Sequence, residues 1–171
     1  PCGASTPMLT AEHIDVKMDY SSLLSTGSML GSGAVIVMDD STCMVHATAV
    51  IIRFFEHESC GKCTPCREGT GWLHQIYSRM LRGEGGESDI DVLLGICRKM
   101  KGKCFCPLGE GAIQPVLSSI KYFREEYERC IRERGCGGEQ CKGMMQGSKH
   151  HMTNKFQAPS TKSQTLRTLD F

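Results

Sequence analysis

Cysteine is the residue whose number and spacing point to chemistry in this sequence. The chain has 171 residues, of which 11 are cysteine. Three cysteines form a Cys-x2-Cys-x2-Cys motif, and a fourth follows 40 residues after the third. Three thiolates from one loop and a distant fourth suit the corners of a [4Fe–4S] cubane, whose irons are separated in space. The spacing therefore predicts an iron–sulfur cluster with the candidate ligands Cys60, Cys63, Cys66 and Cys106.

Zinc is the alternative metal. Structural zinc more often takes two separated Cys-x2–4-Cys or His-x3–5-His pairs around one ion, and the chain would then be a zinc-stabilised helical interaction module. Reactive or structural thiols are a third interpretation. A second metal site is a weaker hypothesis, because uneven spacing favours free thiols there. Its members would be Cys130, Cys136, Cys141, His150 and His151.

The residues around the motif suit a negatively charged cluster. Gly61 removes a side chain where backbone N–H groups must approach the sulfurs, and Pro65 stiffens the loop. Lys62, Arg67 and His57 place positive charge nearby, which favours the reduced cluster and raises its potential. The alternative is that Lys62 and Arg67 are ordinary solvated side chains.

Composition excludes several classes of function. Lys and Arg number 20 against 19 Asp and Glu, a net charge of +1, which argues against nucleic-acid binding. No apolar run approaches the roughly 18 residues of a membrane span, so direct membrane insertion is not expected. Residues 1–7 show no secretory signal. The lack of a visible secretory signal and the odd number of cysteines together favour a reducing compartment over a disulfide framework. No catalytic residue is predicted.

Apolar periodicity predicts a mainly α fold over residues 41–134. The helices are expected at 43–56, at 70–82, from an N-cap at Ser88 to a stop at Gly102, and at 112–134. Pro115 fits the first turn of the last helix, where its missing N–H costs nothing. Four helices with short connections indicate a small antiparallel bundle that binds one iron–sulfur cluster.

The two ends of the chain differ from the helical part. Residues 1–40 are rich in Gly, Ser and Thr, with strand-like runs at 14–18 and 34–38. Two short strands are not stable alone, so this segment needs partner strands. Residues 135–171 are mildly basic and lack apolar periodicity, which predicts a flexible tail or one laid over a partner.

Longer stretches of the sequence resemble the C-terminal part of the NADH- and flavin-binding subunit of respiratory complex I. Related subunits occur in NAD-linked hydrogenases. The likeness rests on residues 3–7, 30–39, 58–69, 106–109, 115–116 and 122–124. It implies that the four cysteines named above ligate a [4Fe–4S] cluster, and its Leu108-Gly109 context favours Cys106 over Cys104 as the fourth ligand. The cluster would take electrons one at a time from reduced flavin, which NADH has reduced, and pass them toward quinone or another acceptor.

The resemblance also implies partners. The family binds NADH and FMN in an N-terminal domain, so both cofactors would lie on a domain or partner outside this sequence. The Gly31-Ser32-Gly33 segment is no substitute, because it leads into a strand-like run rather than a helix. The isolated chain is therefore not expected to oxidise NADH. Its partners would be other subunits of an NADH dehydrogenase or hydrogenase. The chain itself would be a fragment, a split subunit or a degenerate copy of such a subunit.

The resemblance to this family implies that the chain has three parts, and it implies a cellular location. Residues 1–40 would be the back half of a β-grasp (SLBB) module, in which Cys2 departs from the glycine of the family. Residues 41–134 would be the helical cluster domain, and 135–171 the tail. The expected location is the peripheral arm, on the cytoplasmic face of a bacterial membrane or the matrix side of the mitochondrial inner membrane.

Overall fold

The computed structural model describes residues 1–136, and helices dominate this part of the chain. The elements are η1 (Ala11–His13), α1 (Tyr20–Ser25), α2 (Met44–Glu58), α3 (Thr64–Leu81), α4 (Asp89–Met100) and α5 (Pro107–Arg132). No strand occurs between residues 1 and 136, so the predicted mainly α fold is confirmed. None of the helices in this range is long and apolar enough to cross a membrane.

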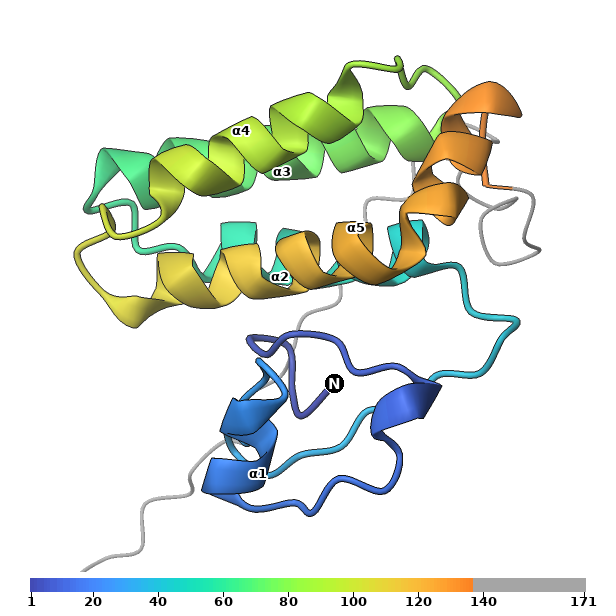
Figure 1. Ribbon diagram of the computed structural model, residues 1–171. Helices are drawn as coiled ribbons and strands as arrows, with labels where there is room; N and C mark the ends of the chain where they lie inside the picture. Colours follow the sequence, from blue (N-terminus) through green and yellow to red (C-terminus); the bar gives the residue numbers. More distant parts are fainter. Residues whose placement is uncertain (137–171) are drawn as a thin grey trace, which may run out of the picture.

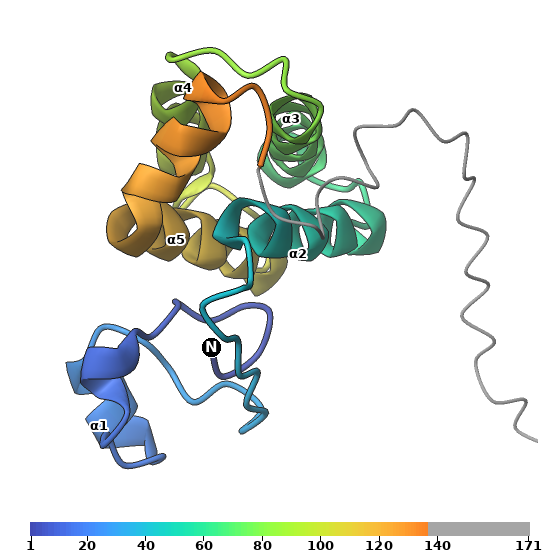
Figure 2. The same ribbon diagram turned by 90° about the vertical axis from the view of Figure 1, so that its right-hand side faces the viewer.

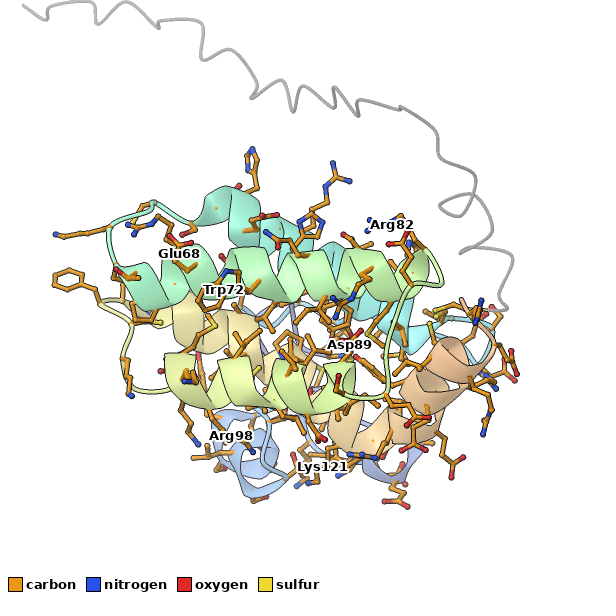
Figure 3. All side chains as sticks on the ribbon, turned by 90° about the horizontal axis from the view of Figure 1, so that it is seen from above. Glu68, Trp72, Arg82, Asp89, Arg98 and Lys121 are labelled. Carbon is orange, nitrogen blue, oxygen red and sulfur yellow. The ribbon has the colours of Figure 1, made fainter. Side chains whose placement is uncertain are left out.

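Helices α2 to α5 pack around one apolar core, with α3 and α4 in one layer and α2 and α5 in the other (Figures 1 and 2). Each helix contributes a fully buried side chain to this core, namely Val45, Leu73, Leu93 and Ile113. Burying one such side chain contributes about 1.5–3 kcal/mol. Glu68, Arg98 and Lys121 point outward (Figure 3). The apolar stripes seen in the sequence are therefore the surfaces that join the helices.

Two helices begin earlier than the apolar pattern predicted. The helix expected from residue 70 starts at Thr64, and the one expected from residue 112 starts at Pro107. The prediction that Pro115 lies in the first turn is wrong, because Pro115 lies buried inside α5. Pro65 and Pro107 occupy the first turns instead, where a missing N–H costs no hydrogen bond.

The strands expected at residues 14–18 and 34–38 are not found, and this prediction is wrong for residues 1–136 as described. A strand needs a paired ladder of backbone bonds, yet the 34–38 run has the single bond from the Ile36 N–H to the Pro1 carbonyl, at 2.9 Å. Residues 1–40 instead attach to α5 through Met8, which is 1% exposed and whose N–H donates to Ser118 Oγ at 2.9 Å. The β-grasp part of the prediction is therefore not confirmed.

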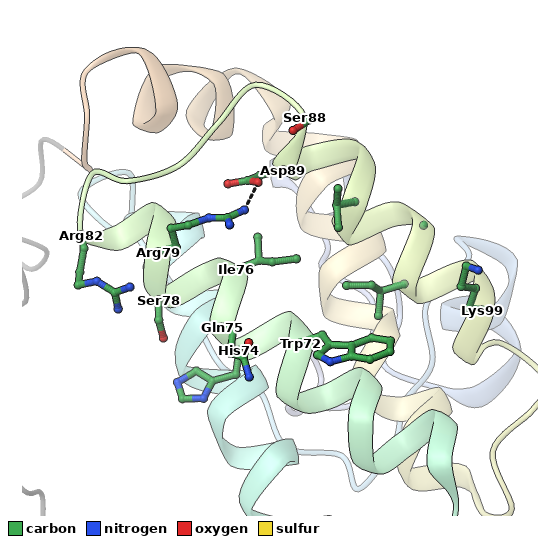
Figure 4. A pocket seen from close by; sticks show the side chains of 13 residues that line it. Trp72, His74, Gln75, Ile76, Ser78, Arg79, Arg82, Ser88, Asp89 and Lys99 are labelled. Atoms are coloured by element: carbon green, nitrogen blue, oxygen red, sulfur yellow. Dashed lines mark hydrogen bonds and ion pairs between the residues drawn. The ribbon is translucent and has the colours of Figure 1, made fainter.

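A buried carboxylate fastens α4 to α3. Asp89, the first residue of α4, accepts from the Gly86 N–H at 2.9 Å and pairs with the Arg79 guanidinium of α3 (Figure 4). A negative side chain at a helix N-terminus also interacts favourably with the helix dipole. The same face carries a groove of about 1000 Å³ that includes Trp72 and Lys99. This groove contains none of the cysteines.

A row of hydroxyl groups crosses the core between α3 and α5. Tyr77 and Tyr127 are 0% exposed, with their hydroxyl oxygens 2.9 Å apart. Tyr127 lies 2.7 Å from Ser119 Oγ, which donates to the Val116 carbonyl at 3.1 Å. Burial raises the pKa of Tyr77 well above its usual range and that of Tyr127 from 10.0 to about 12. Both phenols are therefore neutral hydrogen-bonding groups.

We expect these phenols to make stability fall at high pH. An unfolded tyrosine loses its proton near pH 10, whereas folded Tyr127 keeps it to about pH 12. Stability present below about pH 10 is therefore lost as the pH rises, by up to about 1.4 kcal/mol per pH unit for each such phenol. Denaturant unfolding from about pH 9 to about pH 11 should show a shallower decline for Tyr127→Phe. The exposed Tyr20→Phe should keep the parent slope, and equal slopes for all three proteins would contradict the prediction.

Candidate metal centre

The four candidate ligands come from two connections that meet at one end of the bundle. Cys60 and Cys63 lie in the α2–α3 connection, Cys66 in the first turn of α3, and Cys106 directly before α5. Figure 1 shows the α2–α3 and α4–α5 connections at the same end. The charges of Cys60, Cys63 and Cys106 all act on the Cys66 thiol. The fold thus brings together all four cysteines that the sequence singled out.

Two of the candidate ligands are helix N-caps, and for Cys63 the sequence analysis did not predict this. Cys63 is the N-cap of α3 and Cys106 the N-cap of α5. Helix N-termini carry unsatisfied N–H groups and positive partial charge, which favour a negatively charged group. The signal was present in Pro65 and Pro107, because proline at the first helical positions marks a helix start.

Phe105 connects the two loops. Its backbone N–H points at Cys63 Sγ, 3.5 Å away, and its ring lies under the Lys62 ammonium, 4.4 Å from the ring centre. The N–H of Phe105 is the main reason why the pKa of the Cys63 thiol is lowered, with a second contribution from the N–H of Cys66. Donors of this kind stabilise a thiolate.

Cys66 lies deepest of the four. It is 5% exposed, with Ser59 Oγ 3.4 Å from its sulfur. Burial raises the pKa of its thiol, and the neighbouring cysteine charges add to the rise. Cys60 and Cys106 are exposed. The four cysteines therefore border the buried interior of the bundle at Cys66 and face solvent at Cys60 and Cys106.

Cys104 is placed as a partly buried thiol. Its S–H donates to the Met100 carbonyl at 3.5 Å, and burial raises its pKa to about 11. A side chain at Gly109 would overlap the sulfur of Cys104 and lie 3.6 Å from the Cβ of Cys66. Gly109 thus lets α5 approach both cysteines. The Cys104 side chain also contacts the Cys63 thiol, so Cys106 as the fourth ligand stays a prediction.

The donors suit a cluster better than a single ion. In residues 1–136 no three His, Cys, Asp or Glu side chains gather closely enough to hold one metal ion. Four sulfurs around one zinc lie roughly 3.8 Å apart, since the Zn–S bond is about 2.3 Å. A cubane spreads its four thiolates over separate irons. Four cysteines at one end of the bundle, with N–H donors and two helix N-termini, fit the larger group.

The charges expected around the motif are only partly available to it. Arg67 donates to the Gly61 carbonyl at 2.7 Å and pairs with Glu68 at 2.8 Å. His57 lies 3.1 Å from Glu58, and its side chain is 86% exposed. Arg67 therefore holds the loop through its backbone, whereas His57 points into solvent.

The hypothesis of a second metal site names five residues, and the structure describes two of them, Cys130 and Cys136. Cys141, His150 and His151 lie outside the described residues. Cys130 and Cys136 are both buried, and their sulfurs lie 2.8 Å apart. They form no three-membered metal group with other described side chains.

Comparison with known proteins defines the class. Residues 46–130 match the family model described as the NADH-ubiquinone oxidoreductase-F iron-sulfur binding region. The four cysteines fall inside this span, so this part of the chain is a [4Fe–4S]-binding region. Residues 46–130 thus belong to this family of iron–sulfur binding regions, and most of the chain is similar to the F subunits of NADH-quinone oxidoreductase.

Relatives and a solved structure agree with this family. The chain is 53% identical to the NADH-quinone oxidoreductase F subunit of Mycobacterium tuberculosis (strain ATCC 25618 / H37Rv) over 136 residues, 80% of this chain and 31% of the relative. The corresponding protein of Streptomyces coelicolor is also 53% identical, over 80% of this chain and 30% of its own length. A crystal structure of an NAD+-reducing [NiFe]-hydrogenase in the H2-reduced state matches with a TM-score of 0.68 and 29% identity, over 75% of this chain and 22% of that one. The chain thus spans about a third of the length of its curated relatives.

Proposed function

We propose that the chain relays electrons within an NADH dehydrogenase, through a [4Fe–4S] cluster held by Cys60, Cys63, Cys66 and Cys106. The observation that carries this proposal is the meeting of the three-cysteine motif and the N-cap Cys106 at one end of the bundle, inside the matched family region. The relatives are named as NADH-quinone oxidoreductase subunits. Electrons would come from reduced flavin and pass toward quinone or another acceptor.

The residues of this chain bind the cluster and shape its surroundings. A bound [4Fe–4S] cluster supplies one-electron oxidation and reduction. Cys66 and the bundle behind it exclude water from one side, and the N–H of Phe105 stabilises the thiolate of Cys63. Cys60 and Cys106 lie on the exposed side. That side is where a partner that delivers or takes electrons would have to approach.

The partners in this proposal are a domain that binds FMN and NADH and other subunits of the complex, in its peripheral arm. Large apolar side chains exposed on α2 and in residues 1–40 support a neighbour there, because exposed apolar surface is a common site of association. Val50 and Phe54 on α2 are 52% and 51% exposed, and Ile14 and Val37 are 82% and 87% exposed. We further propose that residues 1–40 complete a β-grasp module when partner strands are present, because the 34–38 run has strand-like composition and a strand needs a partner.

Metal analysis tests the proposal. The full chain, reconstituted without oxygen, should bind about four iron and four sulfide and give a spin-half signal on reduction. About one zinc without sulfide would show that the zinc-stabilised module is the correct alternative. Adding a flavin- and NADH-binding domain should then let NADH reduce the cluster, whereas NADH alone should not. An unreduced cluster beside reduced flavin would contradict the relay.

A further inference from the structure

A second group of cysteines lies at the other end of the bundle. Cys43 is the N-cap of α2, whereas Cys60 follows the C-terminus of that helix. Cys130 lies near the end of α5, whereas Cys106 precedes its start. Because α2 has 15 residues and a helix rises about 1.5 Å per residue, the two ends are roughly 22 Å apart. The second group is therefore separate from the candidate cluster site.

The backbone turns back after α5, so that Cys136 lies next to Cys130. Helical geometry breaks at Phe123, and the last turns of α5 bend over the end of the bundle (Figure 1). Arg134 then adopts a left-handed conformation with φ of 53°, and the Gly135 N–H donates to the Cys130 carbonyl at 2.8 Å. A side chain at Gly83 would overlap the backbone carbonyl of Arg134. This turn is thus packed tightly onto the α3–α4 connection.

The two sulfurs are close and shielded. Cys130 Sγ and Cys136 Sγ are 2.8 Å apart, at 2% and 5% exposure. A disulfide bond is about 2.05 Å long, so a small movement joins them. The contact with Cys136 is the main cause that lowers the pKa of Cys130, and it raises the pKa of Cys136. The lowered pKa supports Cys130 as the thiol that reacts first, and the 2.8 Å between the sulfurs lets Cys136 follow it.

A small cavity gives access to this pair. Its volume is about 90 Å³, and its lining includes Cys43, Cys130 and Cys136 with Glu126 and Arg129. A water molecule needs about 10–15 Å³ of such space, so the cavity has room for several water-sized groups. Hydrogen peroxide fits such a space, whereas a glutathione-sized disulfide does not. The cavity therefore admits a small oxidant.

We propose that Cys130 and Cys136 form a reversible disulfide when a small hydroperoxide enters this cavity. With hydrogen peroxide, an S–O bond forms at Cys130, the O–O bond breaks and hydroxide leaves, giving a sulfenic acid. The Cys136 sulfur then attacks, the S–S bond forms, the S–O bond breaks and a second hydroxide leaves. The two thiol protons convert both hydroxides to water. Two thiols and one peroxide thus give one disulfide and two waters, with two electrons passing from sulfur to oxygen.

Peptide mapping of the full chain, with its cluster reconstituted, tests the proposal. After a small excess of hydrogen peroxide, remaining thiols are alkylated and the protein is digested with trypsin. Cys130 then lies in peptide 130–132 and Cys136 in peptide 135–142. The linked peptide should exceed any link to Cys97 at least tenfold and vanish with a thiol reductant. Cys97 is the internal control, because it is 0% exposed and burial raises its pKa to about 12.

Two variants identify the second thiol, since peptide 135–142 also contains Cys141. The link should disappear in Cys136→Ser and remain in Cys141→Ser. A link that persists in Cys136→Ser and disappears in Cys141→Ser would overturn the proposal. So would recovery of Cys130 and Cys136 as alkylated thiols from peroxide-treated parent protein. The parent measurement stands even if a variant folds poorly.

Discussion

A Cys66→Ser variant should bind less than about one iron under conditions in which the parent protein binds about four. Cys66 is the deepest candidate ligand, at 5% exposure, and it is fixed in the first turn of α3. A serine hydroxyl stays protonated and is a poor substitute for a thiolate ligand. Because metal binding and folding are linked, the variant should also melt at a lower temperature than the parent. Iron and sulfide analysis together with thermal unfolding measure both effects.

The matched control for this prediction is Cys104→Ser, two residues before the fourth candidate ligand. A serine there can donate to the Met100 carbonyl as the thiol does, at 3.5 Å. This variant should keep about four iron, whereas Cys106→Ser should lose the cluster as Cys66→Ser does. Loss of iron in Cys104→Ser with retention in Cys106→Ser would show that Cys104 is the fourth ligand.

Spacing along the sequence predicted which cysteines gather, because three ligands in one loop need no knowledge of the fold. The surroundings of these cysteines depend on contacts between distant residues. The N–H of Phe105 contacts Cys63, which lies 42 residues earlier in the sequence. No local sequence pattern predicts this contact. The charges proposed from Arg67 and His57 could not be placed either, since acidic neighbours compete for both side chains.

The helices were predictable where apolar residues repeat and less so where they do not. The helix expected at 43–56 is found at Met44–Glu58, and the one after Ser88 at Asp89–Met100. The first turns of α3 and α5 contain glycine, proline and cysteine rather than an apolar stripe, so periodicity missed them. Residues 34–38 have strand-like composition, but a strand also needs a partner, which composition does not supply.

The close approach of α5 to the cysteines leads to the last prediction, which concerns Gly109→Ala. An alanine normally stabilises a helix by about 1 kcal/mol relative to glycine. Here its methyl group would overlap the sulfur of Cys104 and lie 2.9 Å from the Cβ of Cys104. Cys104 is short and half-buried, so the backbone must move with it. We expect the variant to lose about 1–3 kcal/mol of unfolding free energy and to retain less iron, because the same movement displaces Cys66.

A second substitution should reverse this loss. Cys104→Ala removes the overlapping sulfur but keeps the Cβ, so the double variant should recover part of the stability, with a coupling of about 1 kcal/mol. Gly95→Ala is the matched control, since its methyl group would meet only Arg98, 3.9 Å away, and it should be neutral or stabilising by up to about 1 kcal/mol. Additive effects of Gly109→Ala and Cys104→Ala in denaturant unfolding would contradict the proposed contact. Recovery of both stability and iron would show that Gly109 acts through the space it leaves for Cys104, and that the cluster forms without the Cys104 thiol.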